Sequence, residues 1–219
     1  MLCHNYIFFD AEPSLGTLPP AELQAAKNQF AEIVRKHEKV NTYAYGTLGL
    51  KAGSRMMLWM QADAAESAQD LVSELVHSEL GRHLKIAYTL FGLVRPSQYT
   101  KNATAQEQAA NSEQRGRYLI VYPFTKTKEW YLLSFEERKE LMFDHMRTGH
   151  KFKEISQVLL YAFGLDDHEF IVSYETENLL DFQTLVMELR ATKARLYTEN
   201  DTPIFTCIYK PLSAALELL

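Results

Sequence analysis

The sequence DLVSEL at residues 70–75 recurs in altered form as TLVMEL at residues 184–189. Each copy follows a Gly-Leu pair, which begins at Gly49 in the first half of the chain and at Gly164 in the second. The interval from that glycine to the first leucine of the copy is 22 residues in the first half and 21 in the second. Agreement in both local sequence and spacing indicates an internal repeat. We therefore expect the two halves to fold alike.

Hydrophobic patterning around the two copies predicts the same order of elements in each half. Apolar residues at helical spacing indicate two helices per half, and segments rich in β-branched and aromatic residues indicate four strands. The expected elements of the first half are a strand at 4–10, a helix at 19–37, strands at 41–50 and 55–62, a helix at 64–78 and a strand at 86–94. Those of the second half are a strand at 116–124, a helix at 134–148, strands at 154–163 and 168–175, a helix at 178–192 and a strand at 203–209.

This βαββαβ order is that of the ferredoxin-like fold, in which both helices cover one face of an antiparallel sheet. The other face stays open, and two such sheets can bury their open faces against each other in an α+β barrel-like core. We therefore expect an α+β protein with two ferredoxin-like domains at 1–99 and 117–219. The segment 100–116 between them is polar and free of aromatic residues, which is typical of a long connection that could act as a mobile lid.

The composition is that of an ordinary globular protein, with 47% hydrophobic and 23% charged residues over 219 positions. A net charge of −5 gives no electrostatic reason to expect a nucleic-acid partner. Two cysteines are too few for a disulfide framework, and they favour a reducing, cytoplasmic setting. The first residues predict neither a signal peptide nor a membrane anchor, and every apolar run is far shorter than the roughly 20 residues that span a bilayer.

The segment SFEERKELMFDHMRTGH at 134–150 predicts a helix with a histidine on its apolar side. A serine followed three residues later by glutamate is a capping-box pattern and marks the helix start. His145 follows Leu141 and Met142 by four and three residues, so all three are expected to share a face. A lone histidine on such a face is more often a packed core or rim residue than a metal ligand. Because no second metal-ligating residue follows at i+3 or i+4, metal ligation would need a cofactor that supplies the other bonds, as a porphyrin does.

Several blocks of the second half resemble the chlorite dismutase superfamily, which includes the coproheme decarboxylases. They are MFDHMRTGHKF, YAFGLDDHEFIVSYET, FQTLVMELRATKARLY and DTPIFT. VYPFTKTKEWYLLSFEER at 121–138 resembles the decarboxylase branch in particular, and the first half adds MMLWMQADAAESAQDLVSEL, SELGRHL and RPSQYT. The blocks follow the order of the family over nearly the whole chain apart from 100–116.

The resemblance implies two ferredoxin-like domains per subunit, a homopentameric ring, and one iron porphyrin bound in the C-terminal half. His145 matches the proximal haem histidine of the family and is the implied ligand of the iron. Tyr122 matches a redox-active tyrosine of the decarboxylases, whose radical takes a hydrogen atom from a propionate. Lys126 matches a lysine that holds a propionate. By themselves, these two residues could equally be a strand tyrosine and a solvated loop lysine.

Further candidate contacts to the porphyrin also come from the resemblance. Arg190 matches an arginine that contacts a propionate, and a planar guanidinium suits a carboxylate because it can donate two parallel hydrogen bonds. Arg195 could do the same, although either arginine could be an ordinary surface residue. Trp130 matches an aromatic position near the porphyrin but could equally be a packing residue. Additional candidates are Ser97 and Tyr99.

Departures from the family pattern bear on the activity. Gln157 stands seven residues before Gly164, where the chlorite-decomposing branch has an arginine that steadies an anionic oxychlorine species. A neutral amide holds such an anion less well. Ala194 stands where that branch has a glutamate bonded to the proximal imidazole, and such a contact makes the imidazole a stronger donor. Against the decarboxylases, Phe124 replaces a methionine and Arg195 a small polar residue of one branch, although another branch also has Phe at the first position.

The favoured function is a hydrogen-peroxide-dependent coproheme decarboxylase, an oxidoreductase that converts two propionates of iron coproporphyrin III to vinyl groups and so makes haem b. The expected partners are peroxide, the porphyrin (iron coproporphyrin III or haem b) and further copies of the chain, without nucleic acid or membrane. The alternatives are chlorite decomposition, a haem-binding or haem-transfer protein without turnover, and a family member that has lost haem. His145 and Gln157 are the residues that weigh most in this choice.

Overall fold

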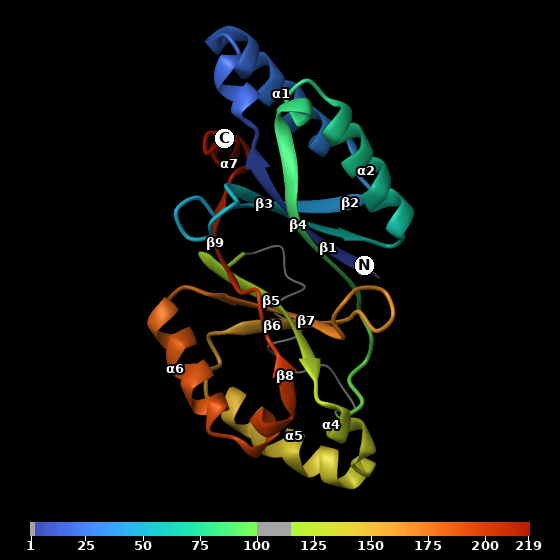
Figure 1. Cartoon of the computed structure of the whole chain (residues 1–219). Coiled ribbons are helices and arrows are strands. Elements are labelled where there is room, and N and C mark those ends of the chain that lie inside the picture. The colour runs from blue at the N-terminus through green and yellow to red at the C-terminus, as the bar shows by residue number, and fades with distance from the viewer. Residues whose placement is uncertain (1–2, 100–114) are drawn as a thin grey trace. The chain divides into compact units, whose positions relative to one another are not determined.

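The computed structural model describes residues 3–99 and 115–219, so residues 100–114 of the predicted connection lie outside the described part (Figure 1). Contacts divide the chain into two compact units. The first consists of Met1–Val94 with Phe205–Leu219, and the second is Arg95–Ile204. Among the described residues, no helix combines the length and the hydropathy needed to cross a membrane.

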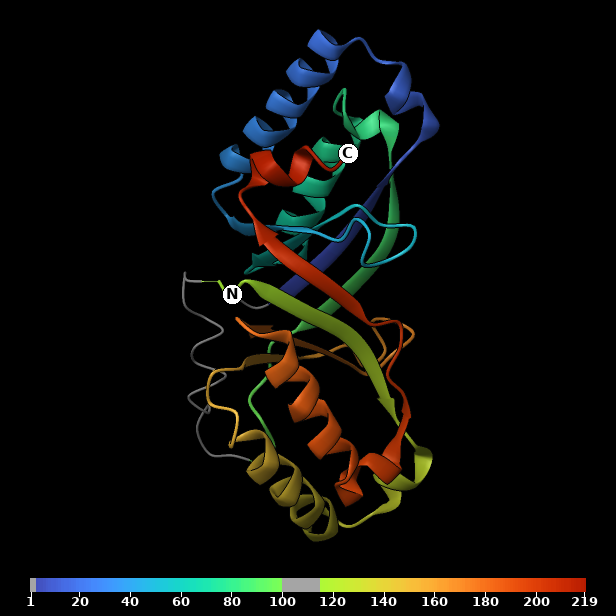
Figure 2. The same ribbon diagram turned by 90° about the vertical axis from the view of Figure 1, so that its left-hand side faces the viewer.

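The first unit has an antiparallel sheet in the strand order β4-β1-β3-β2-β9. The strands are β1 (Cys3–Ala11), β2 (Val40–Gly46), β3 (Met56–Ala62), β4 (Leu84–Leu93) and β9 (Phe205–Lys210). Helices α1 (Pro20–Lys36) and α2 (Ala65–His77) lie on one face of this sheet (Figures 1 and 2). Phe30 of α1 and Leu71 of α2 are fully buried there against Ile7 and Leu58 of the sheet. The shorter elements are η1 (Pro13–Thr17), η2 (Gly81–His83) and α7 (Leu212–Leu216).

The second unit has an antiparallel sheet in the order β8-β5-β7-β6. The strands are β5 (Tyr118–Lys126), β6 (Ser156–Tyr161), β7 (Phe170–Thr176) and β8 (Thr198–Asn200). Helices α5 (Phe135–Gly149) and α6 (Leu179–Arg190) lie on one face of the sheet (Figures 1 and 2). The remaining elements are α4 (Lys128–Leu132) and η3 (Lys193–Tyr197). A core of Ile155, Val172, Tyr174 and Leu185 joins the sheet to α6.

The predicted α+β class is confirmed, and the strand order of the ferredoxin-like fold is present in both units. Every predicted strand and helix is present, with ends shifted by at most four residues. The two glycines that revealed the repeat adopt the same left-handed backbone, with φ of +79° at Gly49 and +68° at Gly164. Glycine suits these turns because it has no Cβ to clash in that conformation.

The last strand differs from the expectation that it would complete the second half. Strand β9 pairs with β2 and groups with the first unit, and the unpredicted strand β8 pairs with the end of β5. The reason is visible in the packing of β9, because the Phe205 ring stacks on Phe8 of β1 with centroids 3.9 Å apart. The tail of the chain therefore buries its apolar residues in the first unit.

Candidate functional site

A cavity of about 250 Å³ lies within the second unit. Its wall combines residues of the sheet strands β5, β6 and β7 with residues of α4, α5, α6 and η3. The structure brings every predicted site residue to this one cavity, although they are scattered along the chain: Tyr122, Lys126, Trp130, His145, Gln157, Arg190 and Arg195. The additional candidates Ser97 and Tyr99 line it as well.

Helix α5 presents His145 to the cavity. The predicted capping box is formed, because the Ser134 hydroxyl accepts a hydrogen bond from the Glu137 amide and the Glu137 carboxylate accepts one from the Ser134 amide. Met142 lines the cavity beside His145, as expected, but Leu141 lines a groove elsewhere on α5. On a helix, positions three and four residues earlier lie about 60° and about 40° to opposite sides of a residue, and the cavity covers only one of those sides.

The imidazole of His145 is held neutral. Burial is the largest cause that lowers its pKa, to about 4 from an ordinary 6.5, and the positive charge of Lys126 adds to the effect. Its Nδ1 atom is buried and has no hydrogen-bond partner among the described residues. Ala194, which replaces the glutamate of the chlorite-decomposing branch, lines the same cavity and is buried. A neutral imidazole is the form that ligates metals.

Tyr122 points into the cavity from β5, where it pairs with Val172 of β7. Its ring stacks with Tyr174, with centroids 6.3 Å apart, and the two phenols share a hydrogen bond. Burial raises the pKa of Tyr122 to about 12, so the phenol keeps its proton at neutral pH. Sequence reasoning missed Tyr174. Tyr174 lies two residues after Val172, so both share the face of β7 that lines the cavity, but no local pattern pairs Tyr174 with Tyr122.

Lys126 ends β5 and is largely surrounded by protein. Burial lowers the pKa of its ammonium to about 8, and the nearby charge of Arg195 acts in the same direction. Its Nζ lies 4.5 Å from the centre of the Trp130 ring, a cation–π contact. Its backbone amide donates to Glu169 Oε2 over 2.8 Å, and the Tyr131 hydroxyl donates to the same oxygen. Trp130 itself is buried.

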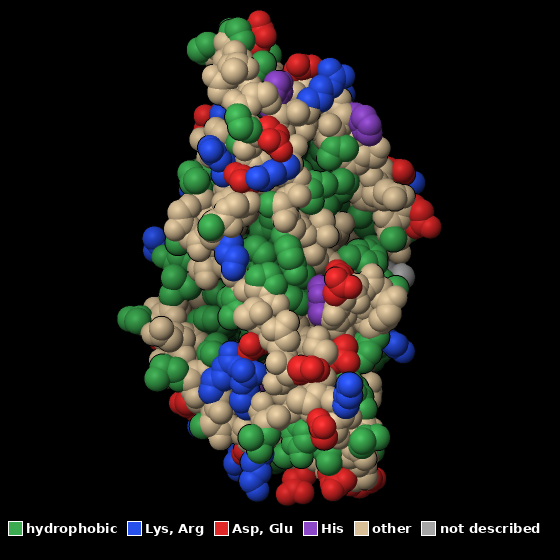
Figure 3. All heavy atoms as spheres, viewed as in Figure 1, with side chains coloured by type: hydrophobic (Ala, Val, Ile, Leu, Met, Phe, Trp, Pro, Cys, Tyr) green, Lys and Arg blue, Asp and Glu red, His purple; other side chains and the backbone are tan. Residues whose placement is uncertain are grey.

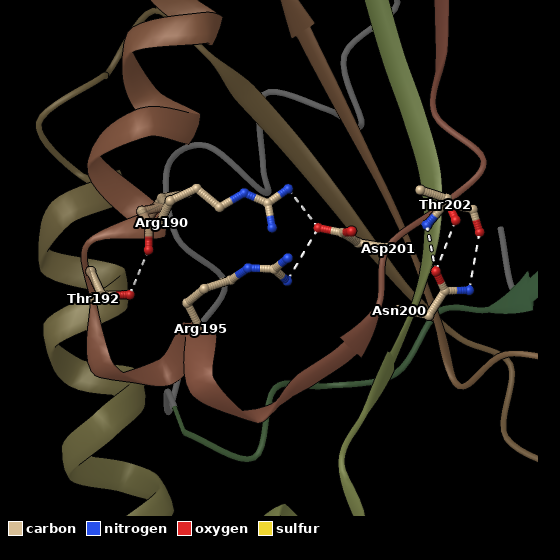
Figure 4. Close-up of polar contacts among 7 residues, drawn as sticks. Arg190, Thr192, Arg195, Asn200, Asp201 and Thr202 are labelled. Carbon is tan, nitrogen blue, oxygen red and sulfur yellow. Dashed lines mark hydrogen bonds and ion pairs between the residues drawn. The ribbon is translucent and has the colours of Figure 1, made fainter.

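The two predicted arginines share one carboxylate (Figure 4). Arg190 and Arg195 place guanidinium nitrogens 2.6 Å and 3.3 Å from Asp201 Oδ2. The neighbouring turn is held because the Thr202 hydroxyl donates to Asn200 Oδ1 over 2.8 Å. Figure 3 shows basic side chains gathered on the surface between α6 and β8. Asp201 was not predicted, because nothing in the DTPIFT block indicates which side chain its carboxylate meets.

The charge of the cavity wall is strongly positive. Four basic side chains line it, whereas Asp201 is the one acidic side chain among the described residues of the wall. The basic residues are Lys126, Arg138, Arg190 and Arg195. Gln157, on β6 opposite Tyr174, adds a neutral amide. The described residues contain no group of three His, Cys, Asp or Glu side chains arranged to hold a metal ion. The basic side chains and the apolar residues of the wall suit an apolar ligand with several acidic groups.

Comparison with known proteins agrees with this arrangement. Residues 23–210 match the family model for chlorite dismutase. The chain is 34% identical over 163 residues to a coproheme decarboxylase from Mycolicibacterium smegmatis. The aligned region covers 74% of this chain and 70% of that protein. A mutant chlorite dismutase from Candidatus Nitrospira defluvii has a TM-score of 0.91 at 26% identity.

The chlorite dismutase of that organism in complex with imidazole has a TM-score of 0.89 at 26% identity. Both of these structural matches cover 99% of this chain and 94% of the other. The family model alone spans far more than half of the sequence, and the curated relative exceeds 30% identity over most of both proteins. The chain belongs to the chlorite dismutase family.

Proposed function

We propose that the second unit binds an iron porphyrin and that the protein is a peroxide-dependent coproheme decarboxylase. The observation that supports this most is the position of His145. Its neutral ring has a buried, unpartnered Nδ1 in a cavity that also holds Tyr122 and an excess of basic side chains. An iron porphyrin with many propionates could use all of these groups. The imidazole would ligate the iron, the phenol would act on a propionate, and the cations would bind carboxylates.

The lining fits such a ligand chemically. Apolar side chains such as Leu159, Val172 and Leu185 suit the faces of a macrocycle. Arg190 and Arg195 are held together by Asp201 and present guanidinium groups to a carboxylate. His145 would be the protein ligand of the iron, and Ala194 leaves its imidazole without the carboxylate that would make it a stronger donor.

The bound iron porphyrin would supply the oxidising power of peroxide, and the residues of the chain would direct it to a propionate. Because the pKa of Tyr122 is about 12, the phenol keeps its proton and must lose an electron and a proton together. The resulting phenoxyl would take a hydrogen atom from the propionate β-carbon, which restores the phenol. Loss of CO2, and of a second electron to the second oxidising equivalent of the peroxide, would leave the vinyl group. Each propionate thus consumes one peroxide and one proton and yields a vinyl group, CO2 and two water molecules.

Lys126 and the arginine pair would hold the reacting and non-reacting carboxylates while Tyr122 acts. Lys126 bears a charge below about pH 8. The curated relative at 34% identity is itself named a coproheme decarboxylase, which supports this activity over chlorite decomposition. Gln157 supports it as well, because a neutral amide lacks the charge that would hold an oxychlorine anion.

The test is to load the protein with iron coproporphyrin, add peroxide and follow the porphyrin by mass spectrometry. We expect two propionates to become vinyl groups in the wild type, and we expect Tyr122→Phe to bind the porphyrin but form no vinyl group. Tyr118→Phe is the matched control on the same strand and should react normally, since Tyr118 does not line the cavity. Vinyl formation by Tyr122→Phe would exclude the proposed role of that phenol.

The same preparation separates the competing functions. Unchanged coproporphyrin after peroxide treatment of the wild type would contradict decarboxylation and leave a binding or transfer role. Oxygen release after addition of chlorite, measured with an oxygen electrode, would instead favour chlorite decomposition, the activity named for the structural neighbours. Failure to take up any iron porphyrin would contradict all of the haem-dependent functions.

A further inference from the structure

Arg138 is a cavity residue with no role in the function proposed so far. It lies on α5 seven residues before His145, and it lines the same cavity. Its Nε atom is buried without a hydrogen-bond partner, and its guanidinium forms no ion pair with any described acidic residue. In contrast, Arg190 and Arg195 both form ion pairs with Asp201. Arg138 is therefore a charged group whose partner is missing from the described chain.

The surroundings of Arg138 explain why no protein group satisfies it. The charge of Arg138 acts on the phenols of Tyr99 and Tyr131, which shows that these two side chains are close to it. Glu169 does not line the cavity, and its Oε2 accepts hydrogen bonds from the Tyr131 hydroxyl and the Lys126 amide, so that oxygen is engaged elsewhere. A half-buried guanidinium without a partner is costly, because it has lost part of its hydration and gained no hydrogen bond in return.

We infer that Arg138 binds a carboxylate of the ligand, at a place separate from the pair formed by Arg190 and Arg195. The separation follows from Asp201, whose carboxylate forms ion pairs with Arg190 and Arg195 but not with Arg138. Arg138 lies on α5, whereas Arg190 ends α6 and Arg195 belongs to η3. A ligand that engages both places must carry acidic groups at different edges, as a porphyrin with four propionates does. This inference rests on the proposed function, since it assigns one more contact to the same ligand.

A ligand-binding role of Arg138 and a structural role predict different effects on stability and on affinity. If Arg138 is unpaired until a ligand binds, Arg138→Gln removes an unsatisfied cation. The ligand-free variant should then be at least as stable as the ligand-free wild type in urea denaturation. The same variant should bind iron coproporphyrin about tenfold more weakly or worse, because a charged hydrogen bond to the ligand is lost. Binding is measured by quenching of tryptophan fluorescence, which requires no turnover.

Two further variants complete the design. Arg138→Lys keeps the charge without the planar fork, so its affinity should lie between those of the wild type and Arg138→Gln. Lys139→Gln removes an exposed charge from the next position of α5 and should leave the affinity unchanged. The affinity of the wild type should also fall more steeply with added salt than that of Arg138→Gln, because the variant forms one fewer charge pair with the ligand.

The outcomes distinguish this inference from the function on which it rests. Normal porphyrin affinity in Arg138→Gln, with a wild type that binds and converts iron coproporphyrin, would overturn the role of Arg138 alone. A loss of stability in the free variant with unchanged affinity would show that Arg138 is structural and would also overturn it. A wild type that binds no iron coproporphyrin would overturn both proposals.

Discussion

At the scale of single residues, Lys126 is the basic residue of the cavity whose charge changes near physiological pH. Burial and the charge of Arg195 lower its pKa to about 8 from 10.5. The protonated form, present below that pH, attracts a carboxylate, and the neutral form above it does not. The affinity for a porphyrin that carries carboxylates should therefore fall as the pH rises through about 8.

This prediction is best tested with metal-free coproporphyrin III, so that hydroxide binding to iron does not contribute. Fluorescence titrations between about pH 7 and about pH 9.5 would span the pKa of Lys126 on both sides. Lys126→Gln should bind more weakly at the lower pH and lose the dependence, whereas Lys128→Gln, an exposed neighbour, should keep it. An affinity of the wild type that stays constant over this range would count against the role of Lys126.

Some residues of the site could be predicted from the sequence, and others could not. The seven predicted residues were named from blocks of sequence, and the structure places all of them on one cavity. The sequence did not predict three further residues, Asp201, Tyr174 and Arg138, for a physical reason. Each matters because of its neighbours. Asp201 meets two guanidiniums, Tyr174 stacks with a second phenol, and Arg138 lacks a carboxylate partner among the described residues. Neighbours of this kind are created by folding and leave no local pattern.

At the scale of elements, α5 matters most because it carries both Arg138 and His145. Its start depends on the capping box, in which the Ser134 side chain accepts from the Glu137 amide over 3.3 Å. Ser134→Ala should lower the free energy of unfolding by about 1 kcal/mol, because a first-turn amide then lacks its partner. Chemical denaturation measures the change.

The matched control for the cap is Ser134→Thr, which keeps a hydroxyl at the same position and should remain close to wild-type stability. If both variants lost the same stability, the hydroxyl would have no part in fixing the start of α5.

The same scale shows which elements a sequence reveals. Long helices and strands were found because each repeats its apolar residues over several periods. The five residues of α4 and the three of β8 are too short to show a period. Helix α7 had a usable signal, since Pro211 precedes a short run with buried Ala215 and Leu216, but the expectation ended at the strand before it. The pairing of β9 with β2 could not be predicted, because strand patterning does not name a partner.

At the scale of the whole molecule, the charge is distributed unevenly. The chain has a net charge of −5, yet its cavity wall has four basic side chains against one acidic side chain among the described residues. A net negative protein does not attract anions in general, so a polyanionic ligand must be selected by this local concentration of cations. A second asymmetry lies between the two units. They have the same strand order, yet His145 and Tyr122 both belong to the second unit.

The central claim is that His145 forms the bond between this protein and the iron of a porphyrin. The most direct measurement compares the affinities for iron coproporphyrin III and for metal-free coproporphyrin III, in the wild type and in His145→Ala. The carboxylate contacts are common to both ligands, so the difference isolates the bond to the iron. We predict that the wild type prefers the iron form, that His145→Ala loses this preference, and that His150→Ala, altered at a second histidine of the cavity wall, keeps it. Equal affinity of the wild type for both porphyrins, or an intact preference in His145→Ala, would contradict the claim.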